Sequence, residues 1–262
     1  MTLPGVLAPL VEDPGAAAVV TDFDGTLAPI VDDPDRAHAV PGAVAALRDL
    51  VEPLALVAVI SGRSVTYLRA QLPIDGLILV GQYGLERLVD GEIVVDERAA
   101  AYADAVAAAA EDAERRWPRL LIERKGTVAL SVHWRATPEA SPAPEELASL
   151  ADQHGLALSP GRMVGELRAP IDVDKGVALR RLLQERPVRA GAFAGDDYGD
   201  LPAFSVLAER AGRDADFVGV RIAVRSTESP AALLAEADYV ADGPPALAAL
   251  MESLATLVSG PR

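Results

Sequence analysis

The feature that most limits the fold of this chain is an alternation of short apolar runs with segments of helical periodicity. Five runs of strand length carry mostly consecutive apolar residues, at 16–23, 54–60, 77–80, 190–195 and 218–224. Strands of this kind are buried on both faces, as in parallel sheets. Segments of helical period lie between them. The alternation predicts an α/β fold, with a mainly parallel sheet covered by helices on both faces.

Two of the helical segments, 41–51 and 175–185, also predict which of their residues are buried. Pro41 suits the first turn of the first helix. The helical period then predicts two apolar faces, which consist of Val44, Leu47 and Leu50 or Val51 in the first segment and of Val177, Leu179, Leu182 and Leu183 in the second.

The middle of the chain does not follow this alternation. Residues 85–97 read as two short strands around Asp90-Gly91, which is a strong hairpin signal. An Ala-rich helix over about 98–116 follows, then strands near 120–124 and 127–134, a helix after "SPAPEE", and further strands near 156–159 and 163–168. This order predicts a second, α+β domain over 82–169, inserted into a first domain formed by 1–81 and 170–262.

Charge and composition narrow the classes of partner. A net charge of −15 and a pI near 4.6 disfavour nucleic acid and anionic membranes as partners. An anionic small substrate therefore needs a local positive centre or a metal ion. Cysteine is absent, which excludes disulfides, thiolate metal sites and a cysteine nucleophile. No basic leader or membrane-length apolar run is evident, so we expect a cytoplasmic protein.

Polar side chains gather where the predicted parallel strands end, which is where ligands bind in open parallel sheets. Asp22 and Asp24 follow the first strand, Ser61 follows the second, and Lys175 begins a helix. A later strand is followed by three more carboxylates, Asp196, Asp197 and Asp200. Segments distant in sequence are thus expected to meet at one edge of the sheet.

The charges at this edge predict a metal and a phosphate. Five converging carboxylates would repel one another, and a hard divalent cation such as Mg²⁺ relieves this repulsion. An ammonium at the first turn of a helix is disfavoured by the helix dipole unless a phosphate is held there. Lys175 therefore points to a phosphate, to which Ser61, Gly62 and Arg63 add further donors.

Simpler explanations exist for several of these residues. Asp24-Gly25 reads equally as a turn, and Asp174 and Asp200 read as helix N-caps. The three histidines, His38, His133 and His154, are scattered without metal-ligand spacing, so we interpret them as structural or surface residues.

Several short motifs of this sequence resemble those of a known protein family. "DFDGT", a Ser after the second strand, a Lys before a helix and "GDDYGD" resemble the haloacid dehalogenase (HAD) superfamily. "DFDGTLAPIVDDPDRA", "ISGR", "LIERKGTVALSVHWR", "GELRAPIDVDKGVAL" and "GDDYGDLPAF" are similar to its trehalose-phosphatase family over nearly the full chain. This resemblance implies a Rossmann-like parallel-sheet core with an inserted α+β cap that sets substrate specificity.

The resemblance also implies a mechanism. Asp22 would attack phosphorus and become an aspartyl-phosphate, while Asp24 would act as general acid and then general base. Phe23, between them, would turn away into packing. Ser61 and Lys175 would hold the phosphoryl oxygens. The expected Mg²⁺ ligands are Asp22, the Asp24 backbone carbonyl, and Asp196 with Asp197 or Asp200.

In this family a Glu-x-Lys pair and a later Glu bind the sugar, which implies the same role for Glu123, Lys125 and Glu166. The implied substrate is trehalose 6-phosphate, with a possible functional link to a trehalose-6-phosphate synthase. Two departures concern the cap entry and the last acidic loop. Gln82-Tyr83-Gly84 stands where many relatives have "HG", so sugar contacts by Gln82 and Tyr83 are expectations only, and Gly199 and Leu201 replace a Thr and an acid.

Four alternatives are weighed at this point. The first is a phosphatase of the same class for another sugar phosphate, such as sucrose 6-phosphate or a glycosyl-phosphoglycerate. The second is a non-catalytic regulatory domain that binds a sugar phosphate; filled catalytic positions disfavour it. A phosphomutase is disfavoured because no second phosphate site is evident, and a dehalogenase because its chemistry does not need Asp24.

Overall fold

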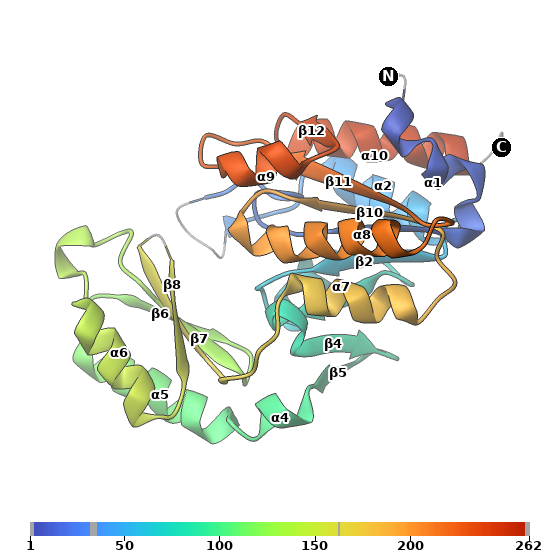
Figure 1. Cartoon of the computed structure of the whole chain (residues 1–262). Helices are drawn as coiled ribbons and strands as arrows, with labels where there is room; N and C mark the ends of the chain where they lie inside the picture. Colours follow the sequence, from blue (N-terminus) through green and yellow to red (C-terminus); the bar gives the residue numbers. More distant parts are fainter. Residues whose placement is uncertain (1–2, 32–35, 162, 260–262) are drawn as a thin grey trace. The chain divides into compact units, whose positions relative to one another are not determined.

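The computed structural model describes residues 3–31, 36–161 and 163–259, and the chain divides into two compact units (Figure 1). Unit 1 consists of Met1–Gly84 and Val173–Arg262, and unit 2 of Leu85–Asp172. Each boundary lies three residues beyond the one expected from the sequence. Gly84 stays with unit 1 because an added Cβ there would lie only 3.3 Å from Ala178. Ala169 stays with unit 2 because its N–H donates to the carbonyl of Val128.

Unit 1 contains six parallel strands in the order β12-β11-β10-β1-β2-β3. Their bounds are Ala17–Thr21 for β1, Leu56–Ile60 for β2, Ile78–Gly81 for β3, Ala190–Gly195 for β10, Val218–Val224 for β11 and Tyr239–Ala241 for β12. Every residue of β1, β2 and β10 is buried, as the consecutive apolar runs predicted. The predicted α/β fold with a parallel sheet is therefore confirmed.

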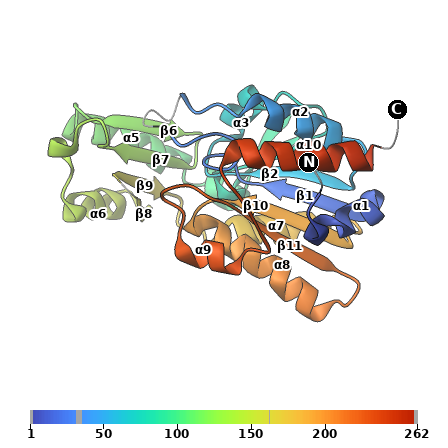
Figure 2. The same cartoon turned by 90° about the horizontal axis from the view of Figure 1, so that it is seen from above.

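Helices cover both faces of this sheet (Figures 1 and 2). Alternate residues of β1 face opposite layers: Ala18 and Val20 join the core with α7 and α8, whereas Val19 and Thr21 border a small cavity lined by α1 and α10. The longer helices are α2 (Pro41–Val51), α3 (Val65–Gln71), α7 (Lys175–Gln184), α8 (Leu201–Arg213) and α10 (Pro244–Val258). The shorter ones are η1 (Gly5–Leu7), α1 (Pro9–Glu12), η2 (Pro14–Ala16), η4 (Gln82–Gly84), η6 (Tyr198–Asp200) and α9 (Ala231–Glu236).

The predicted helix faces are correct in part. In α2 the buried residues are Ala43, Ala46, Leu47 and Leu50, so Val44 and Val51 lie at the edge of the buried face. In α7, Leu179, Leu182 and Leu183 are buried as predicted, but Val177 is 43% exposed. Val177 lies in the first turn, where its N–H donates to the N-cap Asp174, and Gly176 takes the close contact with Pro202 instead.

Unit 2 has a hairpin and a four-stranded antiparallel sheet. The hairpin strands are β4 (Glu86–Val89) and β5 (Glu92–Val95), and the left-handed Asp90 and Gly91 form its turn. The sheet has the order β6-β7-β9-β8, with β6 Leu121–Lys125, β7 Ala129–His133, β8 Ala157–Gly161 and β9 Val164–Arg168. The remaining helices are α4 (Glu97–Ala100), α5 (Ala103–Arg116), η5 (Pro138–Ala140) and α6 (Pro144–Gln153).

One apolar core holds this unit together. Leu130, Val132 and Leu167 from one face of the sheet pack with residues of α5 and α6, such as Ala109 and Leu150. The single Ala-rich helix expected over 98–116 is in fact two helices, α4 and α5. Tyr102 separates them because its backbone is not helical and its ring packs against the core. The opposite face of the sheet is left to polar side chains.

Across the described parts of the chain, we find no helix with the length and apolar character that a membrane span requires.

Candidate active site

Three carboxylates lie together at the carboxyl end of the unit 1 sheet. Asp22 directly follows β1 and Asp196 directly follows β10, and these strands are parallel neighbours. The N–H of Asp22 donates to the carbonyl of Ala194 over 2.8 Å, which fixes the two loops together. One oxygen from each of Asp22, Asp196 and Asp200 lies within 4.8 Å of the others, and all three residues are buried. We call these three residues the acidic cluster.

Lys175 joins two members of the acidic cluster. Its ammonium lies 2.9 Å from Oδ1 of Asp22 and 2.7 Å from Oδ1 of Asp200, and its side chain is only 4% exposed. The other oxygen of Asp200 accepts the backbone N–H groups of Asp196 and Asp197, at 2.9 and 3.0 Å. Asp200 therefore shapes its own loop while it positions Lys175. It precedes α8, but its side chain makes no N-cap hydrogen bond there, so the N-cap explanation does not account for it.

The electrostatics of the cluster follow from burial and from an excess of negative charge. Burial raises the pKa of Asp22 well above its usual value, and Lys175 only partly opposes this rise. Burial, together with the charges of Asp200 and Asp197, raises the pKa of Asp196 to about 8. Burial alone would lower the pKa of Lys175, but the attraction of Asp200 and Asp22 outweighs it and raises that pKa.

The cluster fits a divalent cation. Three buried carboxylates surround one ammonium, so another positive charge would stabilise their ionised forms. The ligand atoms are all oxygens, which hard cations prefer. Gly25 fits this arrangement because a Cβ on it would fall 2.0 Å from Oδ2 of Asp196. Asp24-Gly25 is therefore more than a local turn, because the loop makes room for a carboxylate from β10.

Asp197, a predicted metal ligand, is not part of the acidic cluster. Its carboxylate accepts the N–H of Gly199 over 2.8 Å, and the residue is exposed. This bond caps the short helix η6, so the side chain of Asp197 is used to fold the loop. The sequence did not distinguish the two adjacent aspartates because only the backbone direction after β10 decides which one faces inward.

Asp24 is held by Arg63. Nε and Nη2 of Arg63 each donate to one oxygen of Asp24, both over 2.7 Å. The guanidinium also lies over the ring of Tyr67, 4.5 Å from its centroid. Tyr67 in turn meets the edge of Phe23, which is fully buried, so Phe23 turns into packing as expected. The two aspartates of the "DFD" sequence thus have different partners, Lys175 for Asp22 and Arg63 for Asp24.

The loop that carries Ser61 rests on the segment after β3. Ser61 donates its N–H to the carbonyl of Val80 and accepts from the N–H of Tyr83, both over 3.0 Å. The N–H of Gln82 donates to the carbonyl of Arg63, also over 3.0 Å. A Cβ on Gly62 would lie 2.7 Å from the ring of Tyr83. The backbone of Gln82 and Tyr83 therefore supports the Ser61–Arg63 loop.

Sugar contacts by Gln82 and Tyr83 stay predictions, and the structure shows how the backbone of both residues is arranged. Both have left-handed backbones, with φ of 51° and 57°, which is unusual for residues other than glycine. The side chain of Gln82 is buried, and Tyr83 covers Gly62. Such strained backbone is typical of functional loops. Residues 32–35, within the long motif that begins at Asp22, lie outside the described residues.

The predicted sugar-binding residues lie on one face of the unit 2 sheet. The register aligns Glu123 of β6, Ser131 of β7, Glu166 of β9 and Ser159 of β8 in a single row. Lys125 lies two residues beyond Glu123 on the same face, and its Nζ is 2.5 Å from Oε2 of Glu166. We call this face, which also carries His133, the polar face.

His133, interpreted from the sequence as a structural or surface residue, lies on the polar face. Its Nε2 lies 2.8 Å from Oε2 of Glu123. His38 and His154 have partners as well, Gln71 and Asp112. The motif "LIERKGTVALSVHWR" contains both Glu123 and His133, but the pairing of β6 with β7 decides that their side chains meet. A histidine that shares a strand face with predicted binding residues is the signal that could have found it.

The comparison with known families agrees with this geometry. A model of the family described as Trehalose-phosphatase matches residues 20–243. The chain belongs to the trehalose-phosphatase family. The resemblance noted from the motifs is therefore confirmed, and the matched range contains every residue of the acidic cluster and the polar face.

Relatives in the family are longer than this chain. It is 37% identical over 224 residues to an uncharacterized glycosyl hydrolase of Mycobacterium tuberculosis, covering 80% of this chain and 16% of that protein. It is 32% identical over 222 residues to a trehalose-phosphate phosphatase of Mycobacterium tuberculosis, covering 80% of this chain and 54% of that protein. The chain thus spans about half of the second relative and a small part of the first.

Solved structures share the fold of this family member. A trehalose-6-phosphate phosphatase related protein superposes with a TM-score of 0.72 at 23% identity, covering 90% of this chain and 95% of that one. The C-terminal domain of a Candida albicans trehalose-6-phosphate phosphatase also gives 0.72, at 22% identity, covering 97% and 98%. The C-terminal domain of a Candida albicans trehalose synthase regulatory protein gives 0.67 at 14% identity, covering 97% and 98%.

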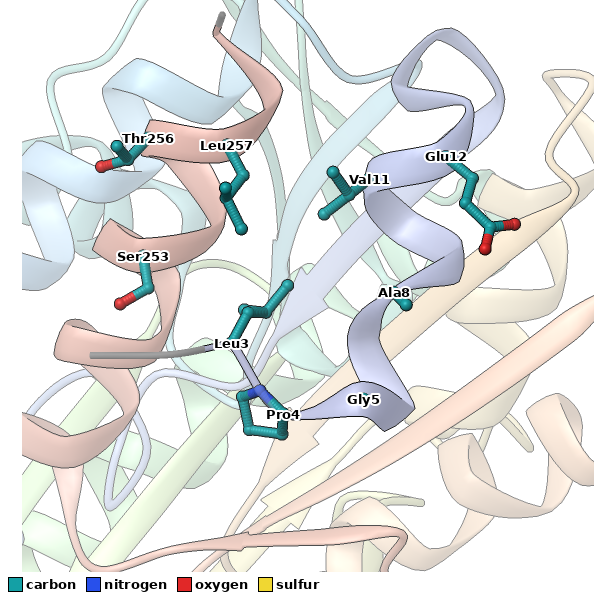
Figure 3. A pocket seen from close by; sticks show the side chains of 9 residues that line it. All are labelled: Leu3, Pro4, Gly5, Ala8, Val11, Glu12, Ser253, Thr256 and Leu257. Carbon is teal, nitrogen blue, oxygen red and sulfur yellow. The ribbon is translucent and has the colours of Figure 1, made fainter.

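A separate groove of unit 1 lacks the features of a phosphoryl site. It has a volume of about 590 Å³ and lies between the N-terminal segment and α10 (Figure 3). Its lining is mostly apolar, with Leu3, Val11 and Leu257 among the contributors, and Glu12 is its one charged residue. A phosphate needs positive charge or backbone donors, so this groove is not the candidate active site of this trehalose-phosphatase family member.

Proposed function

We propose that this chain is a Mg²⁺-dependent phosphatase that hydrolyses trehalose 6-phosphate to trehalose and phosphate. The observation that carries the proposal is the acidic cluster with Lys175 inside it and Asp24 beside it, two residues from Asp22. A nucleophilic carboxylate, an ammonium and a second acid are the groups that phosphoryl transfer through an aspartyl-phosphate needs.

In the first step, Asp22 attacks phosphorus. A bond forms between a carboxylate oxygen of Asp22 and phosphorus as the bond from phosphorus to the sugar oxygen breaks, with the two oxygens in line. Lys175 contacts Oδ1 of Asp22 over 2.9 Å, which orients the carboxylate and leaves its other oxygen to attack. The departing sugar oxygen takes a proton from Asp24, so the products are trehalose and the aspartyl-phosphate.

In the second step, Asp24 accepts a proton from the water that attacks phosphorus. The bond from phosphorus to Asp22 breaks, phosphate leaves, and Asp22 returns to its carboxylate form. Both oxygens of Asp24 accept hydrogen bonds from Arg63 in this structure, which leaves no room for a proton between them. Arg63 must therefore release one oxygen of Asp24 before proton transfer, and it becomes free to contact the phosphoryl group.

The metal site follows from the same residues. Asp22, Asp196 and Asp200, with the backbone carbonyl of Asp24, would hold Mg²⁺, and Asp197 supports their loop from outside. When bound, the cation supplies Lewis-acid neutralisation of the phosphoryl oxygens. Ser61 adds a hydroxyl, and the N–H groups of its loop are held in place by the backbone of Gln82 and Tyr83.

Substrate choice is assigned to unit 2, because the groups around the acidic cluster suit phosphate and metal only. We assign the sugar hydroxyls to Glu123, Lys125 and Glu166 of the polar face. Carboxylates accept hydrogen bonds from hydroxyls, and the ammonium of Lys125 lies 2.5 Å from Oε2 of Glu166, which orients that carboxylate. The family match over residues 20–243 supports trehalose as the sugar.

A cytoplasmic location and a link to a trehalose-6-phosphate synthase complete the proposal. A charged phosphate ester does not cross a bilayer unaided, because its transfer into hydrocarbon is costly. The phosphatase must therefore share a compartment with the reaction that makes its substrate. Synthesis of trehalose 6-phosphate and its dephosphorylation would then be coupled by this shared intermediate.

The test is phosphate release from a panel of sugar phosphates, with Mg²⁺ and with a chelator. The panel contains trehalose 6-phosphate, sucrose 6-phosphate, glucose 6-phosphate and a glycosyl-phosphoglycerate. We expect Mg²⁺-dependent release with a strong preference for trehalose 6-phosphate. Preference for another member would support the phosphatase activity but exclude trehalose 6-phosphate as the preferred substrate. No release from any member would favour a non-catalytic role.

A further inference from the structure

We propose that His133 is a positioning residue for the sugar site, and that it acts by holding the carboxylate of Glu123. This inference rests on the proposed function, because it assumes that Glu123 binds the sugar. It assigns a role to a residue that neither the motifs nor the acidic cluster requires.

The polar face contains two carboxylates, and each has a basic partner. Glu166 meets Lys125 at 2.5 Å, and Glu123 meets His133 at 2.8 Å. Each pair bridges different strands, so neither arises from neighbours along the chain. In both pairs, a basic side chain on one strand therefore orients a carboxylate on another strand.

The register explains how His133 reaches Glu123. Glu123 lies directly opposite Ser131, and His133 is two residues further along β7, so it is the diagonal neighbour of Glu123. Diagonal pairs on one face lie within reach of long side chains. The residues directly opposite His133, Leu121 on β6 and Val164 on β9, are apolar and compete for no hydrogen bond through their side chains. An ionised Glu123 only accepts hydrogen bonds, so Nε2 of His133 is the donor.

The row between the two pairs also fits a polar ligand. Ser131 lies between Glu123 and Glu166 and is fully buried, yet its hydroxyl has no hydrogen-bond partner among the described residues. A buried hydroxyl without a partner is costly unless something binds it. Two oriented carboxylates on either side of such a hydroxyl suit the several hydroxyl groups of a sugar.

Without His133, the carboxylate of Glu123 would lose a hydrogen bond that fixes its orientation, and the sugar would bear more of the cost of ordering it. The chemistry at Asp22 does not involve this carboxylate. The loss should therefore fall on the KM for trehalose 6-phosphate, with little change in kcat. We expect the KM of His133→Ala to rise about tenfold, which is typical of removing a residue that orients a binding group.

The chain offers a matched control in His154. Its Nε2 lies 3.4 Å from Asp112, and the side chains of this pair are 20% and 19% exposed, against 18% and 19% for His133 and Glu123. His154 lies at the end of α6, away from the polar face. His154→Ala should therefore disturb unit 2 to a similar degree and leave the KM for trehalose 6-phosphate within about twofold of the wild type.

The experiment measures kcat and KM for trehalose 6-phosphate and for p-nitrophenyl phosphate, which has no sugar hydroxyls. His133→Ala should raise the KM for the sugar phosphate alone, and His133→Gln, which keeps a donor, should recover most of the loss. In a Glu123→Ala background, the further change His133→Ala should add less than about twofold, because its only target is gone.

Other results would overturn the inference. An unchanged KM in His133→Ala, or full additivity with Glu123→Ala, would exclude action through Glu123. Equal losses on both substrates, shared with His154→Ala, would indicate a structural role only. If His133→Ala does not fold, His133→Gln and the Glu123→Ala background decide the question. A wild-type protein that releases no phosphate from trehalose 6-phosphate would overturn the proposed function itself.

Discussion

The acidic cluster of unit 1 and the polar face of unit 2 both place carboxylates beside bases, but they differ in burial and assembly. Asp22 and Asp200 are 4% and 0% exposed, whereas the side chains of His133 and Glu123 are 18% and 19% exposed. The cluster comes from loops at strand ends, and the polar face from residues within strands. Burial makes the cluster sensitive to any change of charge, and strand register makes the polar face sensitive to the identity of single side chains.

The largest expected effect is that of Asp22→Asn, which removes the nucleophile. We expect hydrolysis of trehalose 6-phosphate and of p-nitrophenyl phosphate to fall together by about 10⁴-fold or more, as for other catalytic nucleophiles. Thermal unfolding serves as the folding control, because the amide keeps nearly the same shape but loses the charge that meets Lys175. Phosphate release on both substrates checks this. Persistent activity in this variant would exclude Asp22 as the phosphorylated residue.

A smaller effect, confined to one substrate, is expected for Glu166→Gln. Loss of a charged hydrogen-bond acceptor should raise the KM for trehalose 6-phosphate by about 10- to 100-fold and leave p-nitrophenyl phosphate nearly unchanged. The matched control is Glu114→Gln, because Glu114 meets Arg124 from the opposite face of β6, at 2.9 Å. Equal KM values for the two variants would show that the polar face does not bind the sugar.

The comparison also predicts how stability depends on pH. The pKa of Asp196 is raised to about 8, so between about pH 4 and 8 the folded protein holds a proton that the unfolded chain releases. Stability of the metal-free protein should therefore fall as pH rises through this window, by up to about 1.4 kcal/mol per pH unit for one proton. Urea unfolding in chelator, for wild type and Asp196→Asn, measures this slope, which the substitution should flatten.

The pH dependence should also change with the metal. A cation at the cluster replaces the proton, so Mg²⁺ should bind more tightly as pH rises and should oppose the loss of stability. A slope of the same size with and without Mg²⁺ would argue that the metal does not bind at Asp196.

The smallest effect is expected for Asp197→Ala. Its carboxylate only caps Gly199, so the Mg²⁺ concentration for half-maximal activity should change less than about threefold. Asp196→Ala, one residue away, should lose most Mg²⁺-dependent activity. Titration of phosphate release with Mg²⁺ compares the two. Similar losses of Mg²⁺-dependent activity in the two variants would show that Asp197 is also a metal ligand.

The two regions also differ in how far sequence alone can predict them. Asp22 and Asp196 each follow an apolar run that predicts a parallel strand. Because parallel strands end at the same edge of a sheet, the sequence alone predicts that these two residues lie close together. No such rule links Asp24 with Arg63 or His133 with Glu123, because these pairs depend on rotamers and on register. The sequence also missed β12, whose three residues are too few for a periodic signal.

The same limit applies to the loop after β10. "GDDYGD" shows that carboxylates are present, but the backbone turn after Gly195 decides that Asp196 faces inward and Asp197 outward. Likewise, apolar periodicity predicted that Val177 lies on the buried face of α7. The structure exposes Val177, because the backbone of Gly176 packs closely against Pro202 at that position. The first miss comes from a local backbone turn, and the second from a contact between segments far apart in the chain.

The pairing of β1 with β10 has a consequence for biosynthesis. Unit 2 is continuous in the sequence, so all its strands are available once residue 172 has left the ribosome. The buried strand β1 still lacks its neighbour at that time, because β10 begins at Ala190. A ribosome that stalls between these points would carry a completed unit 2 beside an open, apolar strand edge of unit 1. Nascent chains of this protein are therefore exposed to aggregation at this strand edge until β10 has left the ribosome.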